Sequence, residues 1–315
     1  KTKKKVLLIG LGKVGFTYDL NNLDNVETHF KAFYKSPNFD LVGVVDISKK
    51  KLNYIYKKFK IKSYLDLDIA LSEKKPDIVI IATPTNTHKN IILKIVKYKP
   101  ELILCEKPLC NNYTDAKLVS SICLRRNIQL FVNYQRRVNR DLIQIKKQID
   151  LNELKTPFKG YCNFSQGLYN SASHFINLSQ FWFGKVKSIK VLNNSKVKNK
   201  DIILDFKLSF KKGEIIFHNV NHYSNDYYKF DIFFKNVLLE YDCIQNIIKL
   251  NNNSNDNDIC EKNKIIKMNS KTYFNEVPLN ILYILEKKSS YICNHKQALE
   301  TLKVIDAMIG IRNEK

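Results

Sequence analysis

The sequence predicts an α/β chain, with a doubly wound parallel sheet in its N-terminal part and an α+β domain on a mainly antiparallel sheet in its C-terminal part. Three observations lead to this fold class. Short apolar runs alternate with helix-like segments over the first 134 residues, which is typical of a parallel sheet with crossover helices. Strand-like alternation of polar and apolar residues dominates after residue 160. The length of 315 residues fits about two domains. We therefore predict one domain at residues 1–134 and a second at residues 135–315.

The first domain is expected to contain five buried strands, each short and rich in branched apolar residues. They lie at residues 6–10, 41–46, 77–82, 102–105 and 129–133. The segments between them, at residues 28–35, 49–59, 90–98 and 114–125, have helix-like composition. Residues 17–26 are interpreted as an insertion after the first strand.

The second domain is expected to begin its core with an apolar helix over residues 171–183, which Gly184 closes. Alternating segments then predict strands at residues 186–192, 202–210, 214–220, 228–234, 237–241 and 247–250. We predict that these strands form a meander. Helices are expected at residues 277–287 and 297–311.

The charge balance raises the question of a polyanionic partner, because Lys+Arg 53 and Asp+Glu 30 give a net charge of +23. The basic residues are mainly lysines scattered along the chain, whereas arginine is the favoured group for base and phosphate forks. We therefore expect a solvated surface and no nucleic-acid partner. The longest apolar runs fall short of the ~18 residues that a membrane span needs, and the seven cysteines contain no C-x-x-C pair. We expect no membrane partner, no metal site and a cytoplasmic location.

A glycine-rich turn follows the first strand. Gly10, Gly12 and Gly15 fit the G-x-G-x-x-G pattern, in which the glycines allow a tight turn, a close approach of a pyrophosphate, and close helix–strand packing. The next strand ends at Asp46, whose carboxylate could accept hydrogen bonds from an adenosine ribose or could cap the helix that starts near Ser48. An acid at this position disfavours a 2′-phosphate, so we predict NAD, with NADP possible.

Two later strands end at the same predicted edge of the sheet, where open α/β sheets bind ligands. One is followed by Thr83, Pro84 and His88, and the other by Glu106-Lys107-Pro108. Proline excludes helical geometry at the preceding lysine and permits a cis bond, so Lys107 would present its amine in a fixed direction. The alternative is that Lys107 is one more surface lysine.

These motifs, with Asn133-Tyr-Gln-Arg-Arg137 and Ser173-His-Phe-Ile-Asn177 in the same order, resemble those of the Gfo/Idh/MocA oxidoreductases. The resemblance covers residues 6 to about 184. It implies an N-terminal Rossmann domain that binds NAD(P) and a C-terminal domain with an open sheet for substrate binding and oligomerisation. The opening block with Thr28-His-Phe further resembles a branch associated with surface-polysaccharide sugar biosynthesis.

The resemblance also implies roles for individual residues. Lys107 and His174 would be the catalytic residues. The cofactor would be contacted by Gly10, Gly12, Lys13, Val14, Asp46, Thr83, Pro84, His88, Glu106, Lys107 and Asn133. The substrate would be contacted by Tyr134, Arg137, Tyr169, Asn170, His174 and Asn177.

The sequence departs from the family pattern where an acid usually precedes the histidine by four residues, because Asn170 stands there. Asn177 likewise replaces a frequent aspartate. A spacing of four would place Asn170 and His174 on one helix face. From the residues alone, His174 could equally be a buried polar residue of an apolar helix.

The function we predict is NAD(H)-dependent hydride transfer between nicotinamide and a carbinol or ketone of a sugar, which we expect to be nucleotide-activated. The substrate is then the expected small-molecule partner, and the chain is expected to form a homo-dimer or tetramer. Two alternatives stay open: a dinucleotide-sensing regulator without turnover, and a nucleic-acid binder.

Overall fold

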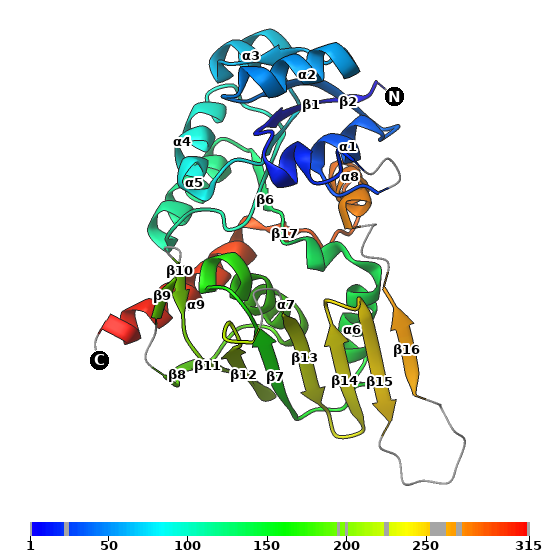
Figure 1. Ribbon diagram of the computed structural model, residues 1–315, viewed down its shortest axis with the longest axis vertical. Helices are drawn as coiled ribbons and strands as arrows, with labels where there is room; N and C mark the ends of the chain where they lie inside the picture. The colour runs from blue at the N-terminus through cyan, green and yellow to red at the C-terminus, as the bar shows by residue number, and fades with distance from the viewer. Residues whose placement is uncertain are drawn as a thin grey trace. The chain divides into compact units, whose positions relative to one another are not determined.

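The computed structural model in Figure 1 describes residues 2–21, 25–193, 196–198, 201–223, 227–252, 263–268 and 273–313. The chain forms two compact units. The first unit comprises residues 1–139 and 271–299, and the second comprises residues 140–270 and 300–315. The predicted fold class is confirmed, because the first unit has a parallel sheet and the second a mainly antiparallel one.

The first unit is built on seven strands in the spatial order β17-β6-β5-β4-β1-β2-β3. Strands β1 to β6 pair in parallel, and β17 is antiparallel to β6. The sheet therefore has the doubly wound order 3-2-1-4-5-6, which reverses between β1 and β4. The strands are β1 (Lys4–Ile9), β2 (Phe39–Val45), β3 (Ser63–Tyr64), β4 (Ile78–Ile81), β5 (Leu102–Cys105), β6 (Gln129–Val132) and β17 (Cys293–Asn294).

Side-chain caps start several helices of this unit. Thr28, Ser48, Asp66 and Asn112 each accept a hydrogen bond from the backbone N–H three residues later. The helices are η1 (Lys13–Thr17), α1 (His29–Tyr34), α2 (Lys49–Phe59), α3 (Leu67–Lys74), α4 (Thr85–Ile95), α5 (Tyr113–Arg125), η2 (Gln135–Val138) and α8 (Tyr273–Leu285). We did not anticipate β3 and α3, because β3 is two residues long and the apolar residues of α3 do not follow one helix face.

A late segment returns to the first unit. Helix α8 lies beside α1 (Figure 1), and its residues Phe274, Val277 and Ile281 are buried in the same core as Phe30. Strand β17 then extends the sheet at β6. This division differs from the predicted one, which ended the first domain at residue 134 and assigned all later residues to the second. The return depends on packing between residues far apart in sequence, which local patterns do not report.

The second unit contains an eight-stranded sheet in the order β16-β15-β14-β13-β7-β12-β11-β8. The predicted meander is wrong in one respect: β7 lies between β12 and β13 and pairs in parallel with β12. The strands are β7 (Phe158–Phe164), β8 (Ser188–Val191), β11 (Phe206–Phe210), β12 (Gly213–Asn219), β13 (Tyr228–Phe233), β14 (Val237–Asp242), β15 (Ile247–Asn252) and β16 (Lys264–Lys267). In a separate two-stranded sheet, β9 (Lys196–Lys198) pairs antiparallel with β10 (Asp201–Ile203).

Helices α6 (Arg140–Asp150), η3 (Leu168–Ala172), α7 (Ser173–Phe183) and most of α9 (His295–Asn313) complete the second unit. Helix α7 packs on the sheet through Phe175 and Trp182, whose rings lie 5.5 and 6.0 Å from that of Phe230. The indole of Trp182 also donates to the Leu142 carbonyl at 3.1 Å. Within the described ranges, no helix is both long and apolar enough to cross a membrane.

Candidate active site

The glycine turn joins β1 to η1, and its three glycines serve different purposes. Gly10 has φ of +96°, and a Cβ there would lie 2.5 Å from the Ala82 carbonyl oxygen. A Cβ on Gly15 would lie 2.1 Å from the Gly10 carbonyl oxygen. By contrast, no described atom lies within 4 Å of a Cβ built on Gly12. Gly10 and Gly15 are therefore required by packing, whereas Gly12 leaves open space beside the backbone.

Helix η1 begins at this open space. Gly12 is its N-cap without a side-chain cap, and its carbonyl accepts the N–H groups of Phe16 and Thr17 at 2.9 and 3.0 Å. The first backbone N–H groups of a helix have no acceptor within it, so they can bind an anion such as a phosphate. Lys13 is exposed on this turn, and Val14 packs partly against the core.

Asp46 follows β2 and holds the glycine turn. Its Oδ2 accepts the Leu11 N–H at 2.6 Å, and its Oδ1 accepts the Ser48 N–H at 2.7 Å. The helix cap itself is Ser48, so the capping alternative for Asp46 does not apply. Lys51 reaches the same turn and donates to the Leu11 carbonyl at 2.8 Å. An acid and a lysine thus meet at the end of β2.

His88 differs from its predicted role, because the structure buries it completely. Its Nε2 lies 2.9 Å from the Thr83 carbonyl, and its Nδ1 lies 3.1 Å from the Pro108 carbonyl. Burial lowers the pKa of His88, more than these carbonyls raise it. His88 therefore ties together the turns after β4 and β5, and we assign it a positioning role in place of cofactor contact. Thr83 itself is half-buried and Pro84 is exposed at the start of α4.

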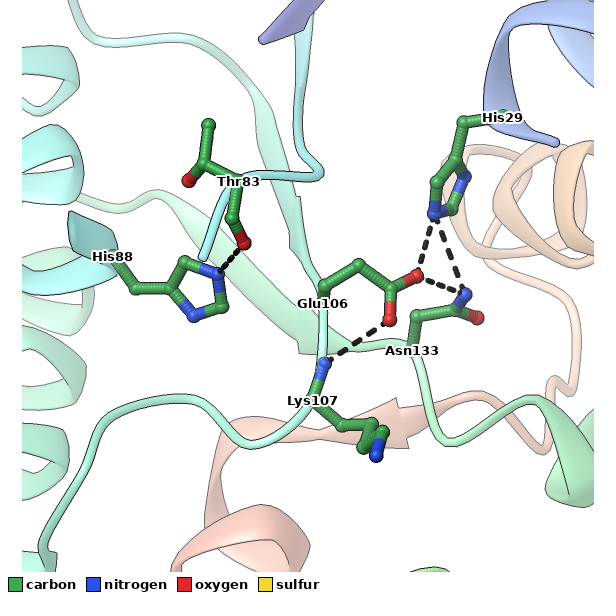
Figure 2. A network of polar contacts seen from close by, with 6 residues as sticks. All are labelled: His29, Thr83, His88, Glu106, Lys107 and Asn133. Carbon is green, nitrogen blue, oxygen red and sulfur yellow. Dashed lines mark hydrogen bonds and ion pairs between the residues drawn. The ribbon is translucent and has the colours of Figure 1, made fainter. Parts of the chain in front are cut away.

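Glu106 and Lys107 follow β5, and the peptide bond between Lys107 and Pro108 is cis. Figure 2 shows the two side chains leaving the strand end in different directions. Glu106 Oε1 accepts from the Asn133 amide at 2.7 Å and lies 2.7 Å from His29 Nε2. Its Oε2 accepts the Lys107 N–H at 3.3 Å. Asn133 was predicted to contact the cofactor, but it is buried and its amide contacts Glu106.

The charge of Glu106 follows from these contacts. Burial alone would raise its pKa, but the hydrogen bond of His29, the Asn133 amide and the charge of Lys107 together lower it. The site therefore holds an ionised carboxylate beside Lys107. Sequence reasoning did not select His29 as a site residue. The available signal was that a lone histidine directly follows the insertion and opens a helix.

In the second unit, Asp201 organises the start of the helix that carries Tyr169 and Asn170. Its carboxylate accepts the N–H groups of Tyr169 and Asn170 at 3.1 and 2.9 Å. A Cβ on Gly167 would lie 2.1 Å from the Asp201 carboxyl carbon, so a glycine is needed there. Asn170 is exposed, as substrate contact requires. Burial, with Asp306 and Asp201 nearby, raises the pKa of Tyr169 to about 12.

We predicted that Asn170 and His174 lie on one face of a single helix. The structure instead divides this segment between the π-helix η3, which carries Asn170, and helix α7, which starts at Ser173 and carries His174. Asn170 is exposed and His174 is half-buried, whereas Asn177 is fully buried. The Asn177 amide donates to Thr301 Oγ1 at 3.0 Å and so joins α7 to α9. Its burial does not fit the predicted substrate contact.

Two predicted substrate residues at the end of the first unit are also buried. Arg137 is 5% exposed and donates from Nε to the Tyr291 carbonyl at 3.2 Å. Burial lowers its pKa, against a smaller opposite effect of Cys293. Arg137 thus holds the returning segment before β17, which corrects its predicted role as a phosphate clamp. Tyr134 is 2% exposed.

Comparison with known proteins shows what the first unit is similar to. Residues 4–134 match the model of an oxidoreductase family, Gfo/Idh/MocA, with an NAD-binding Rossmann fold. This confirms the predicted Rossmann domain and its cofactor, NAD. The chain is 24% identical over 154 residues to "Myo-inositol 2-dehydrogenase" of Thermotoga maritima, covering 49% of this chain and 42% of that protein. It is 27% identical over 157 residues to "scyllo-inositol 2-dehydrogenase (NAD(+))" of Bacillus subtilis, covering 49% and 43%. The chain therefore spans less than half the length of these relatives.

The fold of both units recurs in solved structures. One is the WlbA dehydrogenase from Bordetella pertussis, crystallised in complex with NADH and UDP-GlcNAcA. It aligns over 100% of this chain and 96% of its own length, with a TM-score of 0.80 and 17% sequence identity. At this identity the likeness concerns the fold.

Proposed function

We propose that this chain, a member of the Gfo/Idh/MocA oxidoreductase family by its first unit, transfers hydride between NAD(H) and a carbinol or ketone of a sugar. The observation that carries the proposal is the glycine turn at the carboxyl end of β1, next to the point where the strand order reverses. Open α/β sheets bind ligands at this point. Lys107 follows β5 at the same edge of the sheet.

The residues of the first unit fit a dinucleotide. Gly12 leaves space that a Cβ would fill, and the first turn of η1 offers backbone N–H groups to a pyrophosphate. Asp46 would accept hydrogen bonds from the adenosine ribose and disfavour a 2′-phosphate. When bound, NAD would accept or supply the hydride.

Lys107 and His174 are proposed as the residues that handle the substrate oxygen. The Lys107 amine would donate a hydrogen bond to that oxygen and stabilise negative charge developing on it. The His174 ring would take the hydroxyl proton during oxidation and return it during reduction. Asn170 cannot ionise, so its amide would bind or orient but would not act as a base. Tyr169 and Asn170 are proposed to contact the sugar.

The substrate class is proposed to be a sugar, and a nucleotide-activated sugar of polysaccharide biosynthesis within that class. Support for a sugar comes from the relatives, which are named as inositol dehydrogenases. Support for a nucleotide sugar comes from the similar fold crystallised with UDP-GlcNAcA. We also propose a homo-oligomer, since Tyr161 and Phe233 stand exposed on the second sheet at 44% and 47%.

A substrate screen tests the proposal. Sugars and nucleotide sugars are incubated with NAD, and formation of NADH is followed by absorbance, with Lys107→Ala and His174→Ala beside the native chain. We expect turnover by the native chain and a loss of at least about a hundredfold in each variant. Turnover that survives both substitutions would contradict the assigned roles.

The alternative is a dinucleotide-sensing regulator of the same fold. Two observations favour it: Asn170 cannot ionise, and the side chains of Asn177 and Arg137 are buried. Under this alternative the native chain binds NADH without turning over any sugar, and neither Lys107→Ala nor His174→Ala changes NADH affinity.

A further inference from the structure

A buried polar network beside Lys107 contains a histidine for which no role has been given. His29 is the first residue of α1 and is 1% exposed. Figure 2 shows His29 and Asn133 converging on one oxygen of Glu106, both at 2.7 Å, while the other oxygen accepts the Lys107 N–H. These described hydrogen bonds thus link His29 of α1, Asn133 after β6 and the backbone of Lys107 through one carboxylate.

We propose that His29 is a positioning residue: by donating from Nε2 to Glu106, it holds that carboxylate directed at the Lys107 backbone, and so fixes how Lys107 presents its amine. The role in presenting the amine to a substrate rests on the proposed function. The network itself stands on the contacts within the first unit.

The direction of the hydrogen bond follows from the partners. An ionised carboxylate only accepts, so the proton of this contact is on His29 Nε2. His29 Nδ1 is buried without a hydrogen-bond partner among the described residues. The Phe274 ring packs edge-on against the imidazole at 5.0 Å. A second N–H at Nδ1 would be buried without an acceptor, so the geometry fits the neutral Nε2–H tautomer.

The insertion after the first strand explains how His29 reaches this place. Asp19 is buried and accepts the Glu27 N–H at 2.7 Å and the Thr28 hydroxyl at 2.9 Å. Thr28 in turn caps α1 by accepting the Lys31 N–H at 3.3 Å. The start of the helix is therefore fixed by local contacts, and His29 occupies its first position.

The titratable groups near Glu106 come from three elements. His29 belongs to α1 and His88 to α4, while Cys105 and Lys107 lie at the end of β5 itself. Burial raises the pKa of Glu106, and the His29 hydrogen bond is the largest of the effects that lower it. Removing His29 therefore leaves the effect of burial less opposed.

The sign of the pH effect follows by linkage. The pKa of Glu106 is lower in the folded chain than in the unfolded chain. At pH values above the unfolded pKa, the ionised carboxylate therefore stabilises the fold. This stabilisation is lost as the pH falls through the folded pKa. Without the His29 donor, the stabilisation by the Glu106 carboxylate is smaller at neutral pH. Below the folded pKa of Glu106, where the carboxyl group is protonated, the loss of the donor has little effect on stability. Because a buried neutral histidine also ionises when the chain unfolds in acid, the comparison that isolates the donor is that of His29→Leu with His29→Gln, neither of which titrates.

Thermal unfolding of the full chain at pH 7.5 and at about pH 3, below the ordinary pKa of a glutamate, tests this difference. The variants are His29→Leu, which removes the donor, and His29→Gln, whose amide nitrogen reaches the place of Nε2. His222→Leu, at an exposed turn, is the matched control. We expect His29→Leu to unfold about 3 °C or more below His29→Gln at pH 7.5, and this difference in Tm to shrink at about pH 3. A difference in Tm that is equal at both pH values, or absent at pH 7.5, would overturn the proposal.

A second measurement reports on Lys107 without cofactor or substrate. The rate of reductive methylation of Lys107, read by peptide mass spectrometry, is expected to change severalfold in His29→Leu and little in His29→Gln. An unchanged rate would overturn the link to Lys107. If His29→Leu does not fold, the tautomer of His29 in the native chain can be measured from the nitrogen NMR spectrum of the histidine rings. An Nδ1–H tautomer at His29 would refute the assignment of Nε2 as the donor. These results do not depend on hydride transfer, so their failure and that of the proposed function are separable.

Discussion

Substituting Gly12 by alanine should separate folding from cofactor binding. Gly12 has φ of −72° and ψ of −164°, which alanine adopts without strain, and its Cβ would meet no described atom within 4 Å. The variant should therefore fold at least as stably as the native chain, with a gain of about 0.4–1 kcal/mol from the less flexible unfolded chain. The same methyl group would occupy the space beside the first turn of η1, where the pyrophosphate is proposed to approach.

The expected loss of affinity follows from the cost of overpacking one methyl group, about 1–3 kcal/mol. This corresponds to a Kd for NADH raised about five- to 150-fold. Calorimetric titration measures the Kd, and urea unfolding measures the stability. Gly310→Ala is the matched control, because a Cβ there also meets no described atom within 4 Å and lies in α9. Native NADH affinity in Gly12→Ala would refute the proposed path of the pyrophosphate.

Three further substitutions test other parts of the site. Gly10→Ala places a Cβ 2.5 Å from the Ala82 carbonyl oxygen at φ of +96°. Urea unfolding should therefore show that the free energy of unfolding falls by about 2–5 kcal/mol. A decrease below about 1 kcal/mol would contradict the packing role of Gly10. Asp46→Ser removes the acid but keeps Lys51 at the turn. In paired titrations, the affinity for NADPH should therefore rise at least about tenfold relative to the affinity for NADH. An unchanged preference between the two dinucleotides would argue against Asp46 as the selecting group. Asp201→Ala leaves the Tyr169 and Asn170 N–H groups without their acceptor. The free energy of unfolding should therefore fall by about 0.5–2 kcal/mol. Asp201→Asn keeps a side-chain oxygen as acceptor and should retain much of the native stability.

Local sequence patterns were enough to predict most parallel strands of the first unit and several of its candidate site residues. Gly10, Gly12 and Asp46 were selected because each follows a buried strand, and the end of a strand is visible in the sequence as a change from apolar to turn-forming residues. Lys107 was selected for the same reason, with the proline after it. The structure places these residues at the carboxyl ends of parallel strands.

The predictions that did not fit depend on contacts between distant segments. Arg137 was predicted to clamp a phosphate, but residues 271–299 return to the first unit and the Tyr291 carbonyl takes its Nε. Asn177 was predicted to contact substrate, but Thr301 of α9 takes its amide. A buried arginine and an exposed one look identical in a sequence, so only the packing could distinguish them.

His29 was not selected because its partner Glu106 lies 77 residues away along the chain. The pattern around it indicated only a capped helix after an insertion. The pairing with Glu106 requires both the local contacts of Asp19, which fix where α1 begins, and the position of β5 in the sheet.

Titration of the native chain with NADH and NADPH, repeated with Lys107→Ala, tests the central claim most directly. The account predicts tight binding of NADH, weaker binding of NADPH, and nicotinamide fluorescence that the Lys107→Ala substitution alters. Absence of binding by either dinucleotide would contradict it, because the glycine turn would then serve only to pack β1 against η1.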